Sequence, residues 1–211
     1  MKIAVIGATG ASGKAIIDQV IRKGWSVIAV ARRPDAIEIE DPRCEKRKID
    51  FSDPISVEKA LQGADVVVSA LGQGGLKASA QPTTLYSESA RALIQAMKKL
   101  QIKRLLVLSS GGTDFDEKSP WFYRALLRPY LINNYLDMVK METSLEESQD
   151  LEWTVVRPTY LLDGPSRDYL VKDRRMGGGS FKIHRVDVAD FVVREIEQKA
   201  WVRGYPTLGY P

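Results

Sequence analysis

A short apolar run, Ile3–Ile6, leads directly into the sequence GATGASG at positions 7–13. Beyond these glycines, apolar residues recur near helical spacing as far as Ile21. Glycine lets a chain turn sharply, and three of them in seven positions suit a tight turn between a strand and a helix. The sequence therefore predicts a strand, a turn and a helix in immediate succession.

The same alternation continues along the chain and defines the expected fold. Further strands are predicted at Val27–Ala31, Cys44–Ile49, Asp65–Leu71, Leu105–Leu108 and Trp153–Arg157, and further helices at Ile55–Leu61, from Pro82 to Leu100, at Leu136–Ser148 and at Asp187–Lys199. Continuous apolar strands are typical of parallel sheets covered on both faces. The predicted class is α/β, a single Rossmann-type doubly wound, mainly parallel sheet with helices on both faces. Neither a repeat nor a low-complexity linker divides it, so residues 1–211 are expected to form one domain.

Two stretches interrupt this rhythm, Gly111–Asn134 and Asp163–Ser180, and both follow strand ends. Ligands of such sheets bind beyond the carboxyl ends of the strands, so a substrate lid is expected here. The first stretch carries several aromatic residues: Trp121, Phe122, Tyr123 and Tyr130. They would either stack on a flat substrate or form the core of the lid.

Composition argues against several classes of protein. The net charge of +4 comes from 31 basic and 27 acidic residues spread along the chain, so no nucleic-acid partner is expected. No apolar stretch is long enough to span a bilayer and no secretory signal is recognisable, so no membrane contact is expected. The single cysteine, Cys44, has no metal-binding neighbours, which predicts a reducing cytoplasmic location and no metal site. His184 is expected to have a structural role.

The glycine loop predicts a nucleotide site. Gly7, Gly10 and Gly13 would bring backbone N–H groups against a diphosphate at the helix N-terminus. Sites selective for NAD place a carboxylate about 20 residues further on, at the end of the second strand. This chain has Arg32 and Arg33 there, and a guanidinium can bind a 2′-phosphate through paired hydrogen bonds, so NADPH is predicted. The alternative is that both arginines are simply solvated.

Two further strand ends are candidates for cofactor contacts. Asp50 could accept a hydrogen bond from the adenine amino group, although a turn residue before Ser52 explains it nearly as well. Ala70, Leu71 and Gly72 end the fourth strand with small residues, which would let the adenosine and the nicotinamide ribose approach the backbone.

Alcohol and ketone chemistry on short-chain dehydrogenases uses a tyrosine whose pKa is lowered by a lysine four positions later on one helix. Tyr135 and Lys140 are five apart, which separates them by roughly 140° instead of roughly 40° around a helix. Catalysis by a tyrosine acid with a neighbouring lysine is therefore not expected on this helix. A tyrosine from another element could still act as the acid. Lys140 and Glu142 are expected to form a surface ion pair, and Arg157 to satisfy loop carbonyls.

Several segments together carry a family resemblance: GATGASG, ARRP, IDFSD, SALGQ, PTTLYSESARALIQAMK, LSSGG and VVRPTYLLDG. Over essentially its whole length the chain resembles the NmrA-like atypical short-chain dehydrogenases/reductases, and within them the flavin and biliverdin reductases. The resemblance implies that NADPH binds in extended form and that the protein is a monomer or a weak homo-oligomer. It implies cofactor contacts as follows: Thr9, Gly10, Ala11, Ser12 and Gly13 to the diphosphate, Arg32 to the 2′-phosphate, Asp50 and Phe51 to the adenine, and Ser109, Pro158 and Thr159 further along the cofactor.

The resemblance also implies two catalytic candidates. Ser110 matches the family's serine near the nicotinamide, and Tyr160 stands where the family often has a histidine. The implied activity is hydride transfer from NADPH to a flat acceptor, a flavin or a linear tetrapyrrole, which needs mainly positioning and no strong acid. A quinone reductase and a non-catalytic NADP(H)-binding redox sensor of the NmrA type are the alternatives. An epimerase or dehydratase is a weaker one, because the chain lacks their long C-terminal substrate domain.

Overall fold

The computed structural model describes residues 1–74, 80–114, 123–176 and 181–211. Its centre is an eight-stranded sheet in the order β3-β2-β1-β4-β5-β6-β10-β8. Every neighbouring pair is parallel except β10 and β8 at one edge. The strands are β1 (Lys2–Ile6), β2 (Ser26–Ala31), β3 (Cys44–Lys48), β4 (Val66–Ser69), β5 (Arg104–Leu108), β6 (Glu152–Pro158), β8 (Leu170–Asp173) and β10 (Pro206–Gly209). The predicted doubly wound, mainly parallel α/β fold is confirmed.

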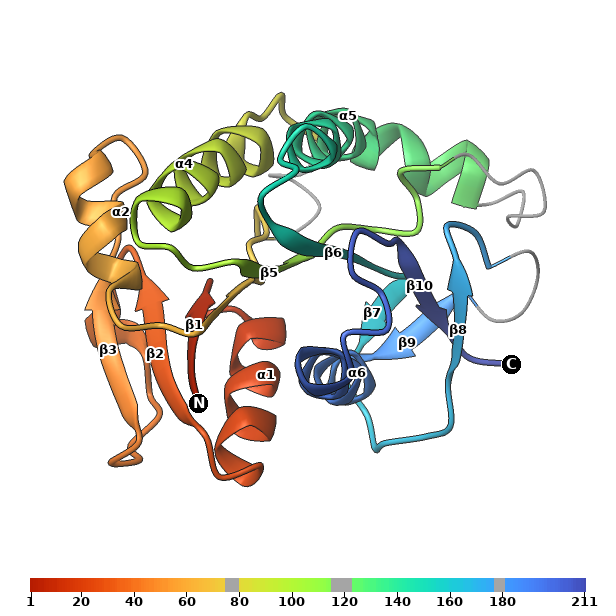
Figure 1. Cartoon of the computed structure of the whole chain (residues 1–211). Coiled ribbons are helices and arrows are strands. Elements are labelled where there is room, and N and C mark those ends of the chain that lie inside the picture. The colour runs from red at the N-terminus through yellow and green to blue at the C-terminus, as the bar shows by residue number, and fades with distance from the viewer. Residues whose placement is uncertain (75–79, 115–122, 177–180) are drawn as a thin grey trace.

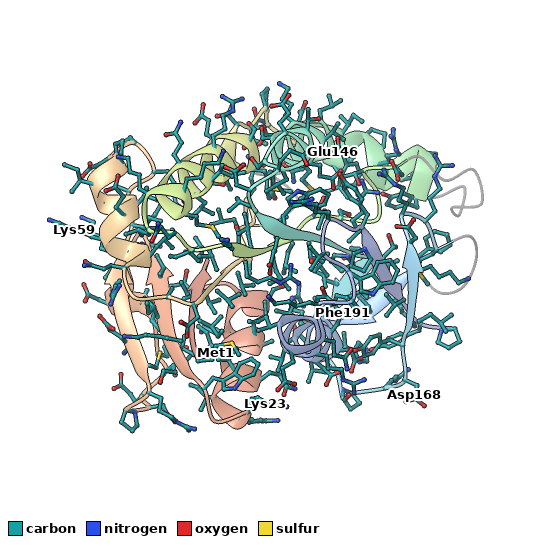
Figure 2. The ribbon with its side chains drawn as sticks, viewed as in Figure 1. Met1, Lys23, Lys59, Glu146, Asp168 and Phe191 are labelled. Carbon is teal, nitrogen blue, oxygen red and sulfur yellow. The ribbon has the colours of Figure 1, made fainter. Side chains whose placement is uncertain are left out.

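Helices cover both faces of the sheet (Figure 1). One face carries α2 (Pro54–Leu61), α4 (Leu85–Lys99) and α5 (Arg128–Glu146), and the other carries α1 (Ala11–Arg22) and α6 (Arg185–Gln198). Side chains fill the spaces between the sheet and these helices (Figure 2) and form two apolar clusters. Alternate residues of β1 divide between them, Ala4 and Ile6 on one side and Ile3 and Val5 on the other. This is why the central strands are apolar throughout.

Acidic side chains stand at the N-termini of three helices. Asp53 caps α2, because its carboxylate accepts a hydrogen bond from the backbone N–H of Ile55 at 2.9 Å. The carboxylate at the N-terminus of α4 belongs to Asp137 of α5, which is 1% exposed. It accepts hydrogen bonds from the backbone N–H of Tyr86 at 2.8 Å and from the hydroxyl of Ser87. Asp187 lies in the first turn of α6. Each carboxylate is favourable there because the helix dipole is positive at that end.

Some element boundaries differ from the prediction. α4 begins at Leu85 instead of Pro82, because Thr83 and the carboxylate of Asp137 bind its first N–H groups. α5 begins at Arg128, well before Leu136, and a π-helical stretch, Tyr123–Leu127, precedes it. The segment expected to be irregular up to Asn134 is therefore much shorter.

The second irregular stretch also contains regular structure. It includes β8, which pairs antiparallel with β10, a strand that sequence periodicity did not reveal. β7 (Tyr160–Leu162) and β9 (Lys182–His184) form a separate parallel pair beside it. Trp121, Phe122 and the glycines at 177–179 lie outside the described residues. None of the helices in the part of the chain that is described is long and apolar enough to cross a lipid bilayer.

Candidate active site

Glycine is required at two positions of the loop between β1 and α1. Gly7 has φ +85°, and a Cβ there would lie 2.6 Å from the carbonyl oxygen of Ala70. A Cβ on Gly13 would lie 2.2 Å from the carbonyl oxygen of Gly7. The N–H of Gly10 donates to that same oxygen at 2.9 Å and closes the turn. The loop is therefore folded so tightly that α1 begins directly against the end of β1.

The amino-terminal turn of α1 has neither a side-chain cap on Gly10 nor an acidic residue. Thr9, Gly10 and Ala11 are exposed, Ser12 is half-buried and Gly13 is buried. The first N–H groups of a helix lack partners within the helix, and the dipole makes this end positive. These residues thus present donors to solvent where an anion such as a diphosphate would be stabilised. This fits the predicted cradle.

Basic residues follow β2 at the same end of the sheet. Arg32 and Arg33 are both exposed, directly after the buried Ala31. Across from them, Lys14 in the first turns of α1 forms an ion pair with Glu38 at 2.6 Å. The predicted position of the two guanidinium groups at a strand end is thus observed, and they are accessible to a phosphate.

The residues after β3 form a turn. One carboxylate oxygen of Asp50 accepts hydrogen bonds from the N–H of Ser52 at 2.9 Å and from its hydroxyl at 2.7 Å. These bonds lower the pKa of Asp50 below its ordinary value. Phe51 is half-buried, packs against the core and lines a hollow of about 210 Å³ between α2 and α4. The turn interpretation of Asp50 is thus observed, and contact of either residue with adenine stays a prediction.

At the end of β4 the backbone is open. Ala70 is buried and its N–H donates to Ile6 at 2.9 Å, Leu71 is half-buried and Gly72 is exposed. No atom lies within 4 Å of a Cβ built on Gly72, so nothing in the described protein requires glycine there. The next residue, Gln73, has a buried side-chain oxygen that finds no hydrogen-bond partner among the described residues. A polar group of a bound molecule could satisfy that oxygen.

The ends of β5 and β6 meet beside these residues. Ser109 is 6% exposed and its hydroxyl donates to Glu142 at 2.7 Å, so its side chain is engaged within the protein. Ser110 is half-buried. Pro158 is buried, and the buried hydroxyl of Thr159 has no hydrogen-bond partner within the described part of the chain. Tyr160 is 54% exposed and lies on β7, so its ring is not held within the described core.

Behind Ser109 lies a buried ionic network that the sequence did not predict. Glu142 accepts from two nitrogens of Arg157, at 3.1 and 2.6 Å, and Arg157 also donates to Asp114 at 2.7 Å. Burial alone would lower the pKa of Arg157, but the two carboxylates raise it above its ordinary value. The expected surface pair of Lys140 and Glu142 is thus wrong, because Glu142 is only 5% exposed and faces inward.

Two tyrosine hydroxyls adjoin the loop after Ser110. The Tyr123 and Tyr135 hydroxyl oxygens are 2.7 Å apart, and a Cβ on Gly112 would lie 2.5 and 2.6 Å from them. Burial and the neighbouring Tyr123 raise the pKa of Tyr135 far above its ordinary value, while Ser110 lowers it slightly. The position four residues later is Val139, which is exposed. The predicted absence of a tyrosine–lysine pair on this helix is confirmed, but Tyr135 itself lies at the site.

These features together fit a nicotinamide dinucleotide. The free amide donors of α1 match a diphosphate, the arginines after β2 match a ribose phosphate, and the unpartnered polar atoms of Gln73 and Thr159 match polar groups further along an extended molecule. All of them follow the carboxyl ends of parallel strands, where ligands of doubly wound sheets bind.

Comparison with known proteins agrees with this geometry. The pattern of a family described as NAD(P)H-binding matches residues 7–199. The chain is 28% identical over 174 residues to the divinyl chlorophyllide a 8-vinyl-reductase of Arabidopsis thaliana, covering 75% of this chain and 39% of that longer protein. A solved structure from Burkholderia pseudomallei is 29% identical with full coverage of both chains and a TM-score of 0.76. A short-chain dehydrogenase/reductase from Veillonella parvula in complex with NADP is 19% identical, covers all of this chain and 94% of its own, and has a TM-score of 0.79.

Proposed function

We propose, from the premise that the chain belongs to the NAD(P)H-binding family, that it is an NADPH-dependent reductase. In this proposal it transfers a hydride to a flat acceptor, such as a flavin, a linear tetrapyrrole or a quinone. The observation that carries the proposal is the uncapped, acid-free N-terminus of α1 at the same end of the sheet as the exposed Arg32 and Arg33.

The arginines favour NADPH over NADH. A carboxylate at the end of β2 would repel a 2′-phosphate, whereas a guanidinium can form two charge-assisted hydrogen bonds with it. Arg32 and Arg33 occupy this position and are exposed, so binding the phosphate would require no buried ion pair to be broken.

Replacing Arg32 with alanine should therefore weaken NADPH binding selectively. A hydrogen bond to a charged group contributes about 1.5–3 kcal/mol, which corresponds to a loss of about 10- to 150-fold in affinity for NADPH. Affinity for NADH should change less than about twofold. Isothermal titration calorimetry with both nucleotides measures the difference, and the Arg22→Ala variant, altered at the far end of α1, serves as a control. Equal losses for both nucleotides would contradict the assignment of the 2′-phosphate to Arg32.

The tyrosine hydroxyl groups near Ser110 favour an acceptor whose reduction needs no strong acid. The pKa of Tyr135 is raised and no lysine follows it by four positions, so its phenol stays neutral and is a weak acid at neutral pH. Flavins accept a hydride without simultaneous protonation, so the protein needs mainly to position the two rings. The relative from Arabidopsis thaliana, whose name describes reduction of a vinyl group of divinyl chlorophyllide a, supports reduction of a large flat substrate.

The direct test is NADPH oxidation by the purified protein, followed by absorbance, with FMN, biliverdin and 2-methyl-1,4-naphthoquinone in turn. We expect oxidation to accelerate with at least one of these acceptors and to follow saturation kinetics. Absence of acceleration with all three, together with tight NADP(H) binding, would favour the second candidate, a redox sensor that binds the nucleotide without turnover. The missing lysine is the observation that keeps this second candidate open.

A further inference from the structure

We propose that Tyr123, Tyr135 and Ser110 form a hydroxyl relay that delivers a proton to the acceptor as it receives the hydride. This inference rests on the proposed reductase function and extends it by naming the acceptors that the site serves best, those in which hydride transfer creates a strongly basic oxygen or nitrogen anion that must be protonated. Quinones and linear tetrapyrroles belong to this class.

The three hydroxyl groups are contributed by separate parts of the fold. Ser110 follows β5, Tyr135 lies on α5 and is 6% exposed, and Tyr123 begins the π-helical stretch before α5 and is half-buried. The tyrosine oxygens are 2.7 Å apart. Ser110 interacts with the hydroxyl of Tyr135 closely enough to change its pKa. The buried hydroxyl of Tyr135 thus lies between the two half-buried residues Tyr123 and Ser110.

Gly112 holds this arrangement together. Its N–H donates to the hydroxyl oxygen of Ser110 at 3.2 Å. Its missing side chain leaves the space that the two tyrosine hydroxyls occupy, because a Cβ would come within 2.6 Å of either oxygen. A hydroxyl oxygen has two acceptor sites and one proton. When Gly112 and Tyr135 both donate to Ser110, the proton of Ser110 is left for a partner in the cleft.

The proposed step balances as follows. Bound NADPH would supply the hydride, which carries two electrons and one proton, and would be left as NADP⁺. The reduced acceptor takes the proton of Ser110 as its new O–H or N–H bond forms. Ser110 takes a proton from Tyr135, Tyr135 takes one from Tyr123, and water restores Tyr123. Neither tyrosine needs to ionise at rest, which agrees with the burial that raises both of their pKa values.

The relay differs from a tyrosine acid activated by a lysine. Here the neighbour of Tyr135 is a second neutral hydroxyl, which stabilises no phenolate charge of its own. The fixed positive charge that acts on both tyrosines is that of Arg128, at the start of α5. The arrangement can pass a proton on, but it cannot supply a low-pKa acid.

The test compares two acceptors on the same protein. FMN receives the hydride without needing a proton in that step, whereas 2-methyl-1,4-naphthoquinone develops charge on a carbonyl oxygen. In the Tyr135→Phe variant we expect NADPH oxidation by the quinone to fall by about 10²-fold, the usual contribution of positioned proton transfer. Oxidation by FMN should change less than about twofold, because that step does not use the relay. Tyr123→Phe should show the same selectivity, and Tyr205→Phe, which removes a tyrosine hydroxyl that donates to Glu146 at the end of α5, should behave like the native protein.

Three further readouts separate proton delivery from a structural role. NADPH affinity and the thermal unfolding midpoint should match the native values in Tyr123→Phe. The quinone reaction should slow more in D₂O for the variants than for the native protein, because protonation then limits the rate. Without any ligand, ¹³C NMR of labelled tyrosine rings in Tyr135→Phe should show a further rise in the pKa of Tyr123, which loses the hydrogen bond that lowers it.

The outcomes distinguish the relay from the function on which it rests. Equal losses with FMN and the quinone, or no loss with either, would overturn the relay while leaving the reductase function in place. Absence of turnover by the native protein with both acceptors would overturn both. A selective loss with the quinone in both Tyr123→Phe and Tyr135→Phe, with Tyr205→Phe unaffected, would establish the relay.

Discussion

Replacing Glu142 with alanine should lower the free energy of unfolding by about 3–5 kcal/mol. The substitution removes the carboxylate that accepts from two nitrogens of Arg157, leaving that guanidinium with Asp114 alone. Arg157 is 2% exposed, so water cannot replace the lost partner. The hydroxyl of Ser109 loses its acceptor as well. Urea denaturation followed by circular dichroism measures the change.

Two further variants test whether the unpaired charge of Arg157 causes the loss of stability in Glu142→Ala. Glu147→Ala, altered at an exposed position directly after the same helix, should change the free energy of unfolding by no more than about 0.5 kcal/mol. The double variant Glu142→Ala, Arg157→Met should be more stable than Glu142→Ala alone, because no unpaired charge then stays buried. If Glu142→Ala were as stable as Glu147→Ala, the network would not contribute as described.

Replacing Gly13 with alanine should weaken NADPH binding by at least about 100-fold, because the loss of two charge-assisted hydrogen bonds of about 1.5 kcal/mol each suffices for this. The new Cβ would lie 2.2 Å from the carbonyl oxygen of Gly7, a backbone atom that can move only if α1 and the loop separate. The donors at the start of α1 would then no longer converge on one anion. Overpacking of this kind also costs about 1–3 kcal/mol of stability.

Gly72→Ala is the matched comparison for this prediction. No atom of the described residues lies within 4 Å of its new Cβ, so the free energy of unfolding should be unchanged, and this variant controls for stability alone. Fluorescence titration with NADPH and thermal unfolding of both variants separate the two effects. Native-like NADPH affinity in a folded Gly13→Ala protein would contradict the assignment of the diphosphate to this loop.

The central strands and the glycine loop were predictable because their signals are local. β1, β2, β4 and β5 are continuous apolar runs, and they lie where the sequence predicts them, within a residue or two at most ends. The alternation of strands with helices then leaves few possible topologies, since parallel crossovers are right-handed. Arg32 at the end of β2 follows from the same local pattern.

The residues that sequence reasoning misjudged depend on contacts between distant segments. Glu142 is buried because Arg157, on a different element, neutralises it, and charge alone predicts a surface position. Tyr135 was discounted on its spacing from Lys140, although its hydroxyl meets Tyr123 and lies close to Gly112. β8 and β10 are short strands whose pairing is visible only once the sheet is assembled. The burial of Glu142 could have been predicted from the sequence, because α5 carries apolar residues on both sides of it.

The distribution of carboxylates over the helix ends has a consequence for how a ligand can orient. Asp53, Asp137 and Asp187 give α2, α4 and α6 a negative group at the amino-terminal turn, whereas α1 has none. A doubly charged diphosphate would be repelled from those three ends, whereas the amino-terminal turn of α1, directly after β1, would attract it. An elongated dinucleotide anchored there can point only one of its two rings toward the ends of β5 and β6. With the 2′-phosphate at Arg32, as proposed, the adenosine would lie toward β2 and the nicotinamide toward the ends of β5 and β6.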